Sequence, residues 1–319
     1  MFIKQAFNYQ YQFWRYIIGT IIIILFLIGG QIPHAIALFL EEGIDLAGKD
    51  TAQIMQVLDS NLNLFLLLLS FAIGLLGVVL VAKFLHQQPL KALTTTRSKI
   101  DWGRFFFAFG LVAIFSLLVT LGDYFANPED YYFNFQPGPF FVMLIIAVIM
   151  IPLQTSFEEY FFRGYLMQGV GTLVKNRWFP LILTSVIFGG LHFFNPEVAK
   201  LGNIIMIYYI GTGFLLGIMT LMDEGLELAL GFHAGNNLIT AVLVTADWTA
   251  FQTNSIFKDV SDPSMGWDVL IPVLIVYPIF LLIMARKYKW DNWQEKLVGK
   301  VEKPVMLKPS EEDQNFGNL

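Results

Sequence analysis

Hydrophobic residues in this chain come in long runs that are separated by short polar segments. Eight runs can be drawn, each close to the ~20 residues that a helix needs to cross the hydrocarbon core of a bilayer. They lie at about 16–40, 62–85, 104–125, 139–162, 178–195, 201–222, 228–247 and 268–286. The runs lack the period-2 alternation of barrel strands, so they predict helices. The pattern therefore predicts an all-α polytopic membrane protein, a bundle of about eight transmembrane helices.

The composition of the chain agrees with a membrane protein. Of the 319 residues, 56% are apolar and only 14% are charged, so a soluble fold would lack the charge to cover its surface. The chain contains no cysteine, which excludes disulfides, thiolate catalysis and cysteine-ligated metal sites. It also has no long basic patch, so the expected partner is the lipid bilayer and no nucleic acid.

Lys and Arg in the short loops predict the orientation in the membrane. They gather in the N-terminal stretch, in two loops and after the last run, as Lys4, Arg15, Lys83, Lys91, Arg97, Lys99, Arg104, Lys175, Arg177, Arg286, Lys287 and Lys289. The segments near 41–61 and 126–138 are acidic. With eight helices every basic loop falls on one side, which predicts that both termini are cytoplasmic. The turn with Asp223, Glu224 and Glu227 fits poorly, because these residues would face the cytoplasm without a basic partner.

The hydrophobic part reads as one transmembrane domain, residues 1–290, and the polar residues 291–319 are expected to form a flexible cytoplasmic tail. Ala35-Ile36-Ala37 resembles a signal-peptide cleavage site, but its hydrophobic run is too long for an ordinary signal. We therefore expect the first segment to be retained. The compact loops and the lack of an organelle retention signal favour a bacterial inner (cytoplasmic) membrane.

Ionisable side chains inside a bilayer are costly and are therefore candidates for function. Glu158, Glu159 and Arg163 lie in the fourth run, and we place them at the cytoplasmic end of its helix. Glu159 and Arg163 are four residues apart and can pair on one helix face. Glu158 is rotated by about 100° from Glu159 and can stay free, and a free carboxylate in a poorly hydrated place suits a general base. The alternative is an interfacial charge cluster, which helix ends often carry.

Two later clusters each contain a histidine. Phe188 precedes His192 by four residues in the fifth run. His233 precedes Asn237 by four in the seventh, so that both project from one face and could converge on one oxygen. The alternative for either cluster is a hydrogen bond between packed helices.

Some residues near these clusters have a structural interpretation. Gly231 and Gly235 form a small-xxx-small face that lets another helix approach. His34 and His86 lie at the edges of runs without polar neighbours in the sequence, and we interpret both as interfacial.

Together the three clusters resemble the pattern of the CAAX protease and bacteriocin-processing family. These are intramembrane glutamate proteases that include the type II CAAX prenyl endopeptidases. Their pattern is two adjacent Glu with Arg four after the second, then Phe-x-x-x-His, then His-x-x-x-Asn on a later helix. All three motifs occur in this order within residues 139–247, as Glu158-Glu159-x-x-x-Arg163, Phe188-x-x-x-His192 and His233-x-x-x-Asn237. The first three runs carry no signature of the family.

The resemblance implies an intramembrane endopeptidase with a role for each motif residue. Glu158 would activate a water as general base, and His192 would hold and polarise that water. His233 and Asn237 would stabilise the oxyanion of the tetrahedral intermediate. Glu159 and Arg163 would support the site. The resemblance implies no cofactor and no metal, and its substrate would be a membrane-associated peptide or protein, prenylated for some members and unprenylated for others.

One distance does not fit this scheme. His192 lies 14 residues beyond Trp178, or about 21 Å into its helix, whereas Glu158 looks close to the cytoplasmic edge. Either the fourth helix is displaced inward or the fifth begins later.

Three other functions remain open on the sequence. In a metal-dependent version of the same protease, Glu158, His192 and His233 would ligate zinc, although the His-Glu-x-x-His spacing is missing. A non-catalytic membrane scaffold would use the same polar residues for packing and would bind a partner protein. A transporter ranks lowest, because the ionisable residues cluster in one region of the membrane part.

Overall fold

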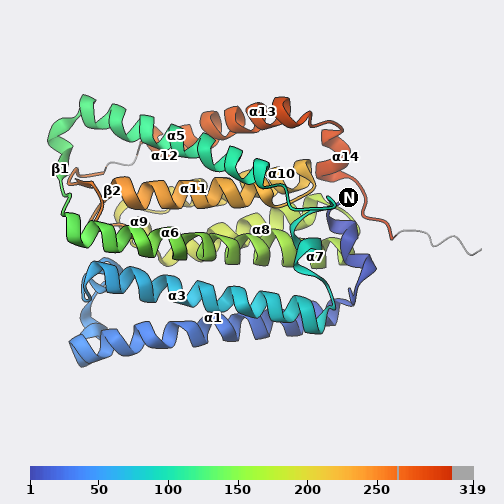
Figure 1. Ribbon diagram of the computed structural model, residues 1–319, viewed down its shortest axis with the longest axis horizontal. Coiled ribbons are helices and arrows are strands. Elements are labelled where there is room, and N and C mark those ends of the chain that lie inside the picture. Colours follow the sequence, from blue (N-terminus) through green and yellow to red (C-terminus); the bar gives the residue numbers. More distant parts are fainter. Residues whose placement is uncertain (264–265, 304–319) are drawn as a thin grey trace, which may run out of the picture.

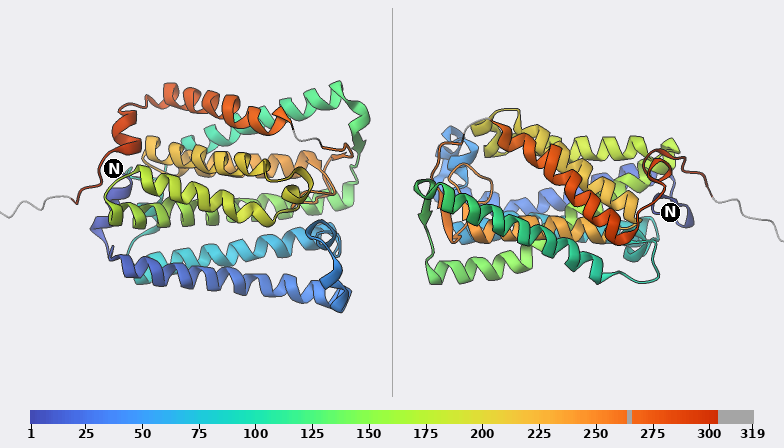
Figure 2. Two further views of the ribbon diagram at one scale, coloured as in Figure 1. Left: turned by 180° about the vertical axis from the view of Figure 1, so that it is seen from behind. Right: turned by 90° about the horizontal axis from the view of Figure 1, so that it is seen from above.

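A computed structural model describes residues 1–263 and 266–303 and shows long helices that run side by side along one axis (Figure 1, Figure 2). The long helices are α1 (Phe13–Glu42), α3 (Ser60–Leu80), α5 (Trp102–Ala126), α6 (Pro137–Glu159), α8 (Trp178–Gly190), α10 (Ile205–Asp223), α11 (Glu227–Leu243) and α13 (Tyr277–Tyr288).

Short helical segments extend or connect the long ones. They are η1 (Ile3–Asn8), η2 (Gly43–Gly48), α2 (Thr51–Ile54), η3 (Val81–Leu85), α4 (Leu90–Thr94), η4 (Pro128–Asp130), η5 (Tyr160–Leu166), α7 (Met167–Val174), η6 (Leu191–Phe194), α9 (Pro196–Leu201), α12 (Trp267–Ile271), η7 (Pro272–Val276) and α14 (Trp293–Val298). A small sheet at one end of the bundle has the order β1-β3-β2. In it β3 (Phe257–Asp259) pairs antiparallel with β1 (Tyr131–Phe133) and parallel with β2 (Val244–Thr245).

Six helical segments of the described residues are long and apolar enough to cross a membrane: Phe13–Gly48, Ser60–Leu85, Trp102–Ala126, Pro137–Val174, Ile205–Asp223 and Val269–Tyr288. The other two predicted segments are helical but shorter, at Trp178–Phe194 and Glu227–Leu243. Most of α11 is buried, and a helix that protein shields from lipid need not present a full apolar span. The predicted class, an all-α polytopic membrane protein, is confirmed.

The fourth hydrophobic run continues further than its sequence indicates. α6, η5 and α7 form one helical segment of 38 residues, Pro137–Val174, which ends where Lys175 takes a left-handed conformation. The expected end near residue 162 is therefore wrong, because the glutamates and arginine read as the polar edge of the helix are themselves buried. A π-helical turn, η5, lies directly after Glu159, and such turns often occur at functional sites.

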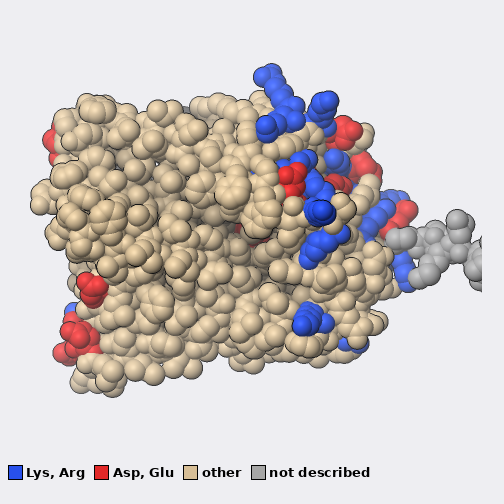
Figure 3. All heavy atoms as spheres, viewed as in Figure 1, with Lys and Arg blue, Asp and Glu red and all other residues tan. Residues whose placement is uncertain are grey.

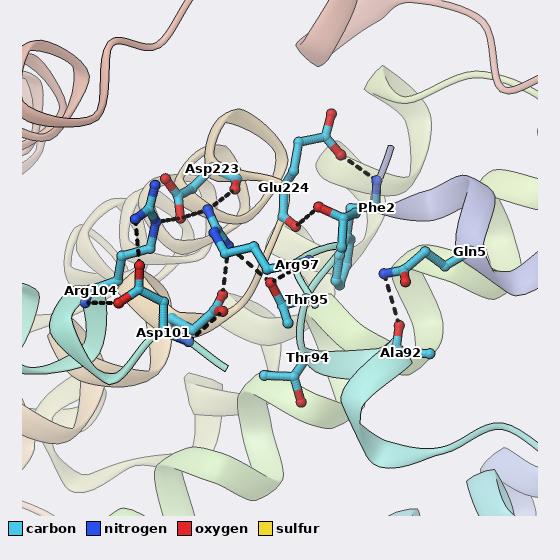
Figure 4. Close-up of polar contacts among 12 residues, drawn as sticks. Phe2, Gln5, Ala92, Thr94, Thr95, Arg97, Asp101, Arg104, Asp223 and Glu224 are labelled. Atoms are coloured by element: carbon cyan, nitrogen blue, oxygen red, sulfur yellow. Dashed lines mark hydrogen bonds and ion pairs between the residues drawn. The ribbon is translucent and has the colours of Figure 1, made fainter. Parts of the chain in front are cut away.

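Charged side chains gather at the ends of the bundle. In Figure 3, nearly all Lys and Arg in view lie at the end where α7, α14 and the N-terminus are found. The acidic turn between α10 and α11 lies at this same end and has basic partners. Arg97 contacts Asp223 at 2.7 Å and Glu227 at 3.1 Å, and Arg104 reaches Asp223 at 2.9 Å (Figure 4). Glu224 lies 3.8 Å from Arg177.

The expectation that Asp223, Glu224 and Glu227 lack a basic partner is therefore wrong. Their partners come from the α4–α5 loop, from α5 and from the segment before α8, which a sequence does not place beside the turn. The network ties these segments to the first residue of α11.

Close helix contacts depend on glycine. A Cβ on Gly231 would lie 2.0 Å from the Phe105 carbonyl oxygen of α5, and one on Gly235 would lie 2.9 Å from the Phe109 oxygen. The predicted small-residue face of α11 is thus the face that packs on α5. Gly213 of α10 has the same role against α8, because its Cβ would lie 2.6 Å from the Ser185 oxygen.

His34 and His86 have no polar neighbours in the sequence, but both have polar partners in the fold. His34 Nε2 lies 2.7 Å from Asn63 Oδ1. His86 is 1% exposed, with Nδ1 2.6 Å from the Gln10 carbonyl and Nε2 3.0 Å from the Tyr165 hydroxyl. Because a carbonyl only accepts, Nδ1 donates and Nε2 accepts from Tyr165. Folding brings these partners from other elements.

Part of the segment expected to be a flexible tail is packed on the bundle. α14 lies within it, Val301 is buried, and the Val301 amide donates to the Lys175 carbonyl at 2.9 Å. The remainder of this segment, 304–319, lies outside the described residues.

Replacing Gly231 by Ala should destabilise the bundle, because the methyl group would overlap the Phe105 carbonyl. Overpacking of this kind costs about 1–3 kcal/mol. We expect a lower thermal midpoint in detergent by scanning fluorimetry. The matched control is Gly110→Ala on α5, where a Cβ meets nothing within 4 Å. Equal midpoints for the two variants would contradict the close contact.

His86 should make stability depend on pH. Burial lowers the pKa of His86 in the fold. The hydrogen bond to the Gln10 carbonyl opposes part of this change, and the charge of Arg15 adds a smaller lowering. The unfolded chain binds a proton near pH 6.5 and the folded chain does not, so stability is lost as the pH falls below about 6.5. We expect the thermal midpoint to fall from pH 7.5 to 5.5 by less in His86→Gln than in the unsubstituted chain. An unchanged pH dependence would contradict this role.

Candidate active site

A buried ion pair on α6 and η5 is the centre of the polar cluster. Arg163 Nη1 lies 3.0 Å from Glu159 Oε1, and both side chains are 0% exposed. The pair expected from the four-residue spacing is therefore present. Arg163 Nη2 also donates to the Gly213 carbonyl of α10 at 3.1 Å, and its guanidinium lies over the Phe188 ring of α8 at 4.2 Å. These contacts offset part of the cost of burying the charges.

His233 of α11 lies between the two adjacent glutamates. Its Nδ1 is 2.8 Å from Glu159 Oε1, and its Nε2 is 3.5 Å from Glu158 Oε2. An ionised carboxylate only accepts, so Nδ1 carries a proton toward Glu159. The His233 imidazole thus links Glu159, which pairs with Arg163, to Glu158, which does not.

An amide chain holds the other oxygen of Glu158. Gln154 Nε2 donates to Glu158 Oε1 at 2.7 Å, and Asn237 Nδ2 donates to Gln154 Oε1 at 3.2 Å. Sequence reasoning missed Gln154. Its signal was an amide one helical turn before Glu158, on the same face of an otherwise apolar helix.

The donors of α11 do not converge on one empty point as the spacing suggested. In this structure His233 contacts both glutamates, while the Asn237 amide contacts Gln154. Helix packing turns this face of α11 toward α6, so each donor already has a partner there. A role for either residue at the substrate oxygen therefore remains a prediction.

His192 lies at the edge of the cluster, in η6. Its Nδ1 donates to the Phe188 carbonyl at 2.8 Å, and its ring stacks on Tyr209 of α10 at 4.5 Å. Since the carbonyl only accepts, Nε2 of the neutral ring carries a lone pair. No hydrogen bond joins His192 to either glutamate among the described residues. The link is the Phe188 ring, whose centroid lies 5.0 Å from His192 and 5.9 Å from His233.

The depths of Glu158 and His192 agree once the full helices are known. Glu158 precedes Val174 by 16 residues, or about 24 Å of helix. His192 follows Trp178 by 14 residues, or about 21 Å. The two helices are joined by a short loop, so the two side chains lie at similar depth. The placement of Glu158 at the cytoplasmic edge is therefore wrong.

Three buried polar atoms of the cluster have no hydrogen-bond partner among the described residues: Glu158 Oε2, Glu159 Oε2 and Arg163 Nε. The 3.5 Å contact to His233 leaves Glu158 Oε2 with a lone pair that no hydrogen bond occupies. The zinc alternative needs Glu158, His192 and His233 to converge. Within residues 1–263 and 266–303, no three His, Asp or Glu side chains are arranged to hold a metal ion.

Comparisons with known proteins agree with the motifs. The family model described as type II CAAX prenyl endopeptidase Rce1-like matches residues 137–239, which begin at the start of α6 and end in α11. The uncharacterized protein YyaK of Bacillus subtilis (strain 168) is 30% identical over 235 residues, 73% of this chain and 78% of that protein. No solved structure matches.

The matched region contains all six candidate site residues, from Glu158 to Asn237, and all of them except His192 are joined by the contacts described above. On this sequence similarity and these motifs, the chain belongs to the type II CAAX prenyl endopeptidase Rce1-like family.

Proposed function

We propose that this chain is an intramembrane endopeptidase in which Glu158 is the general base. The observation that carries the proposal is the difference between the two adjacent glutamates. Glu159 Oε1 accepts from the Arg163 guanidinium and from His233. Within the described part of the chain, Glu158 Oε1 accepts only from the neutral Gln154 amide. Oε2 of each glutamate is buried there without a hydrogen-bond partner, so Glu158 is the one of the two with a free lone pair and no guanidinium beside it. A proton acceptor in a water-poor interior needs such a free lone pair.

The reaction needs one water and no covalent intermediate. Glu158 Oε2 takes a proton from the water, and the water oxygen forms a bond to the carbon of the scissile carbonyl. The carbonyl π electrons move to its oxygen and give an oxyanion. When the C–N bond breaks, Glu158 returns the proton to the leaving nitrogen. Base and acid are thus the same carboxyl in two steps.

The remaining residues supply donors and positioning. With a proton on Nε2, His233 can donate to the oxyanion on the side that faces Glu158, and the Asn237 amide can turn from Gln154 to the same oxygen. Each such donor contributes about 10²-fold or more in rate in a site that excludes water. His192, whose Nε2 lone pair is available, would accept from the attacking water. Arg163 and Glu159 would hold the cluster together.

The substrate follows from where this cluster lies. It sits inside a bundle of apolar helices, so the scissile bond belongs to a membrane-associated peptide or protein. We propose that the basic end of the bundle, where the N-terminus and α14 lie, faces the cytoplasm of a bacterial inner membrane (Figure 3).

Glu158→Gln should lower cleavage by about 10²–10⁴-fold, because the amide cannot take the proton. The gene for this chain is deleted in the organism of origin, and each variant is expressed in its place at matched levels. C-terminal peptides from the membranes are then measured by mass spectrometry. New C-termini should appear with the unsubstituted chain and with the control Glu129→Gln, an exposed residue of η4. Termini that Glu158→Gln also produces would rule out this base. Identical termini in every sample would favour a scaffold.

Orientation can be tested because the chain has no cysteine of its own. The two variants are Glu41→Cys, at the end of α1, and Arg286→Cys, near the end of α13. Both positions are exposed. A membrane-impermeant maleimide should label Glu41→Cys in intact cells. It should label Arg286→Cys only after the membrane is opened. The reverse labelling would invert the proposed topology.

A further inference from the structure

An amide side chain outside the three motifs is bonded to the proposed base. Gln154 lies in α6, one turn before Glu158, and is 4% exposed. Its Nε2 donates to Glu158 Oε1 at 2.7 Å, and its Oε1 accepts from Asn237 Nδ2 at 3.2 Å. Gln154 therefore joins the residue proposed to take the proton to a residue proposed to stabilise the oxyanion.

The hydrogen bonds of this chain all run in one direction. A third amide begins it, because Asn236 Nδ2 donates to Asn237 Oδ1 at 3.1 Å. An ionised carboxylate only accepts, so Gln154 presents its nitrogen to Glu158 and its oxygen to Asn237. Asn237 then presents its nitrogen to Gln154 and its oxygen to Asn236. Hydrogen bonds aligned in this way polarise and strengthen one another, and here they end at Glu158 Oε1.

Packing alone does not require an amide at this position. α6 and α11 already meet at the buried contact between Glu159 and His233. Thr155, the neighbour of Gln154, satisfies its hydroxyl on the Ile151 carbonyl of its own helix at 3.1 Å. Gln154 instead directs its polar atoms to two other side chains. A buried amide costs free energy unless its atoms are paired, and both of its partners are candidate site residues.

The bond from Gln154 determines which oxygen of Glu158 is available. Oε1 accepts from the Gln154 amide. Oε2 is buried without a hydrogen-bond partner among the residues that the structure describes, and it lies 3.5 Å from His233 Nε2. A carboxylate held at one oxygen cannot rotate without losing that hydrogen bond. Gln154 therefore keeps Oε2 on the side of His233.

We propose that Gln154 is a positioning residue that orients the base and an oxyanion donor at the same time. It holds the Glu158 carboxylate with Oε2 toward the attacking water, and it keeps the Asn237 amide beside the base until a substrate binds. The proposal rests on the function proposed above. Gln154 acts through these two residues and touches neither water nor substrate.

The test replaces Gln154 by Met, which keeps the length of the side chain and removes both hydrogen bonds. The matched control is Gln168→Met in α7. Gln168 is also a buried amide, and it accepts from Gln88 at 2.9 Å and donates to the Ala92 carbonyl at 3.1 Å. These hydrogen bonds involve none of the candidate site residues, so the control shows what the loss of a buried amide does to the fold alone.

The measurement is the initial rate at which the C-termini described above appear in membranes, divided by the amount of folded chain. We expect a loss of about tenfold or more in Gln154→Met and an unchanged rate in Gln168→Met. The reason is that a misplacement of about 1 Å at a reacting group can cost about 100-fold. Gln154→Asn keeps an amide in the bundle but withdraws it from Glu158 by one methylene group, and it should also be slow. This variant decides the question if Gln154→Met does not fold.

The link to Asn237 has its own test. Side chains in one hydrogen-bond network are coupled, so their losses do not combine independently. We expect the double variant Gln154→Met, Asn237→Ala to lose less than the product of the two single losses.

The outcomes separate this inference from the proposed function. If Gln154→Met and Gln154→Asn cleave at the rate of Gln168→Met, the inference is overturned, because Gln154 would then serve only the fold. Losses that multiply in the double variant also overturn it. In both cases an inactive Glu158→Gln would leave the proposed function standing. If Glu158→Gln itself still cleaves, the proposed function fails and the inference fails with it.

Discussion

Arg163 and Glu159 lie fully buried and 3.0 Å apart in the interior of an apolar bundle. Either charge alone would cost several kcal/mol in that place, so the pair persists only with partners on neighbouring helices. Three helices supply them: α10 gives the Gly213 carbonyl, α8 the Phe188 ring and α11 the His233 imidazole. One ion pair therefore holds together the helices that carry the candidate catalytic residues.

This arrangement requires that α11 stays in register with α6. A shift by one residue moves a helix by about 1.5 Å along its axis, enough to break the 2.8 Å contact between His233 and Glu159. Two features oppose such a shift. Gly231 brings the backbone of α11 against α5, and the Arg97 network holds the first residue of α11, Glu227. The Gly231 packing contact and the Arg97 charge network thus both fix the position of α11.

The sequence predicted what depends on local pattern. Hydrophobic runs predicted the helices, and the four-residue spacing predicted the Glu159–Arg163 pair. Contacts between segments that are distant in the sequence were missed or were predicted wrongly. The end of the α6–α7 segment was placed too early because buried charges look like a helix edge in a sequence. The partners of Asp223 and His86, and the position of Gln154 beside Asn237, arise from helices that meet only in the folded bundle.

Adjacent glutamates on a helix point in directions about 100° apart, and this rotation gives them different tasks. Glu159 Oε1 is occupied by a guanidinium and an imidazole, so its negative charge is neutralised where it stands. Glu158 meets an amide on one oxygen and only the far nitrogen of that imidazole on the other. In the part of the chain that the structure describes, His233 is the one side chain with a polar contact to both. A change of charge on Glu158 therefore acts on Nε2 of His233, while Nδ1 stays held by Glu159, and the ring can respond to that change without moving. Because Arg163 pairs with Glu159 and not with Glu158, the proposed role of general base falls to Glu158.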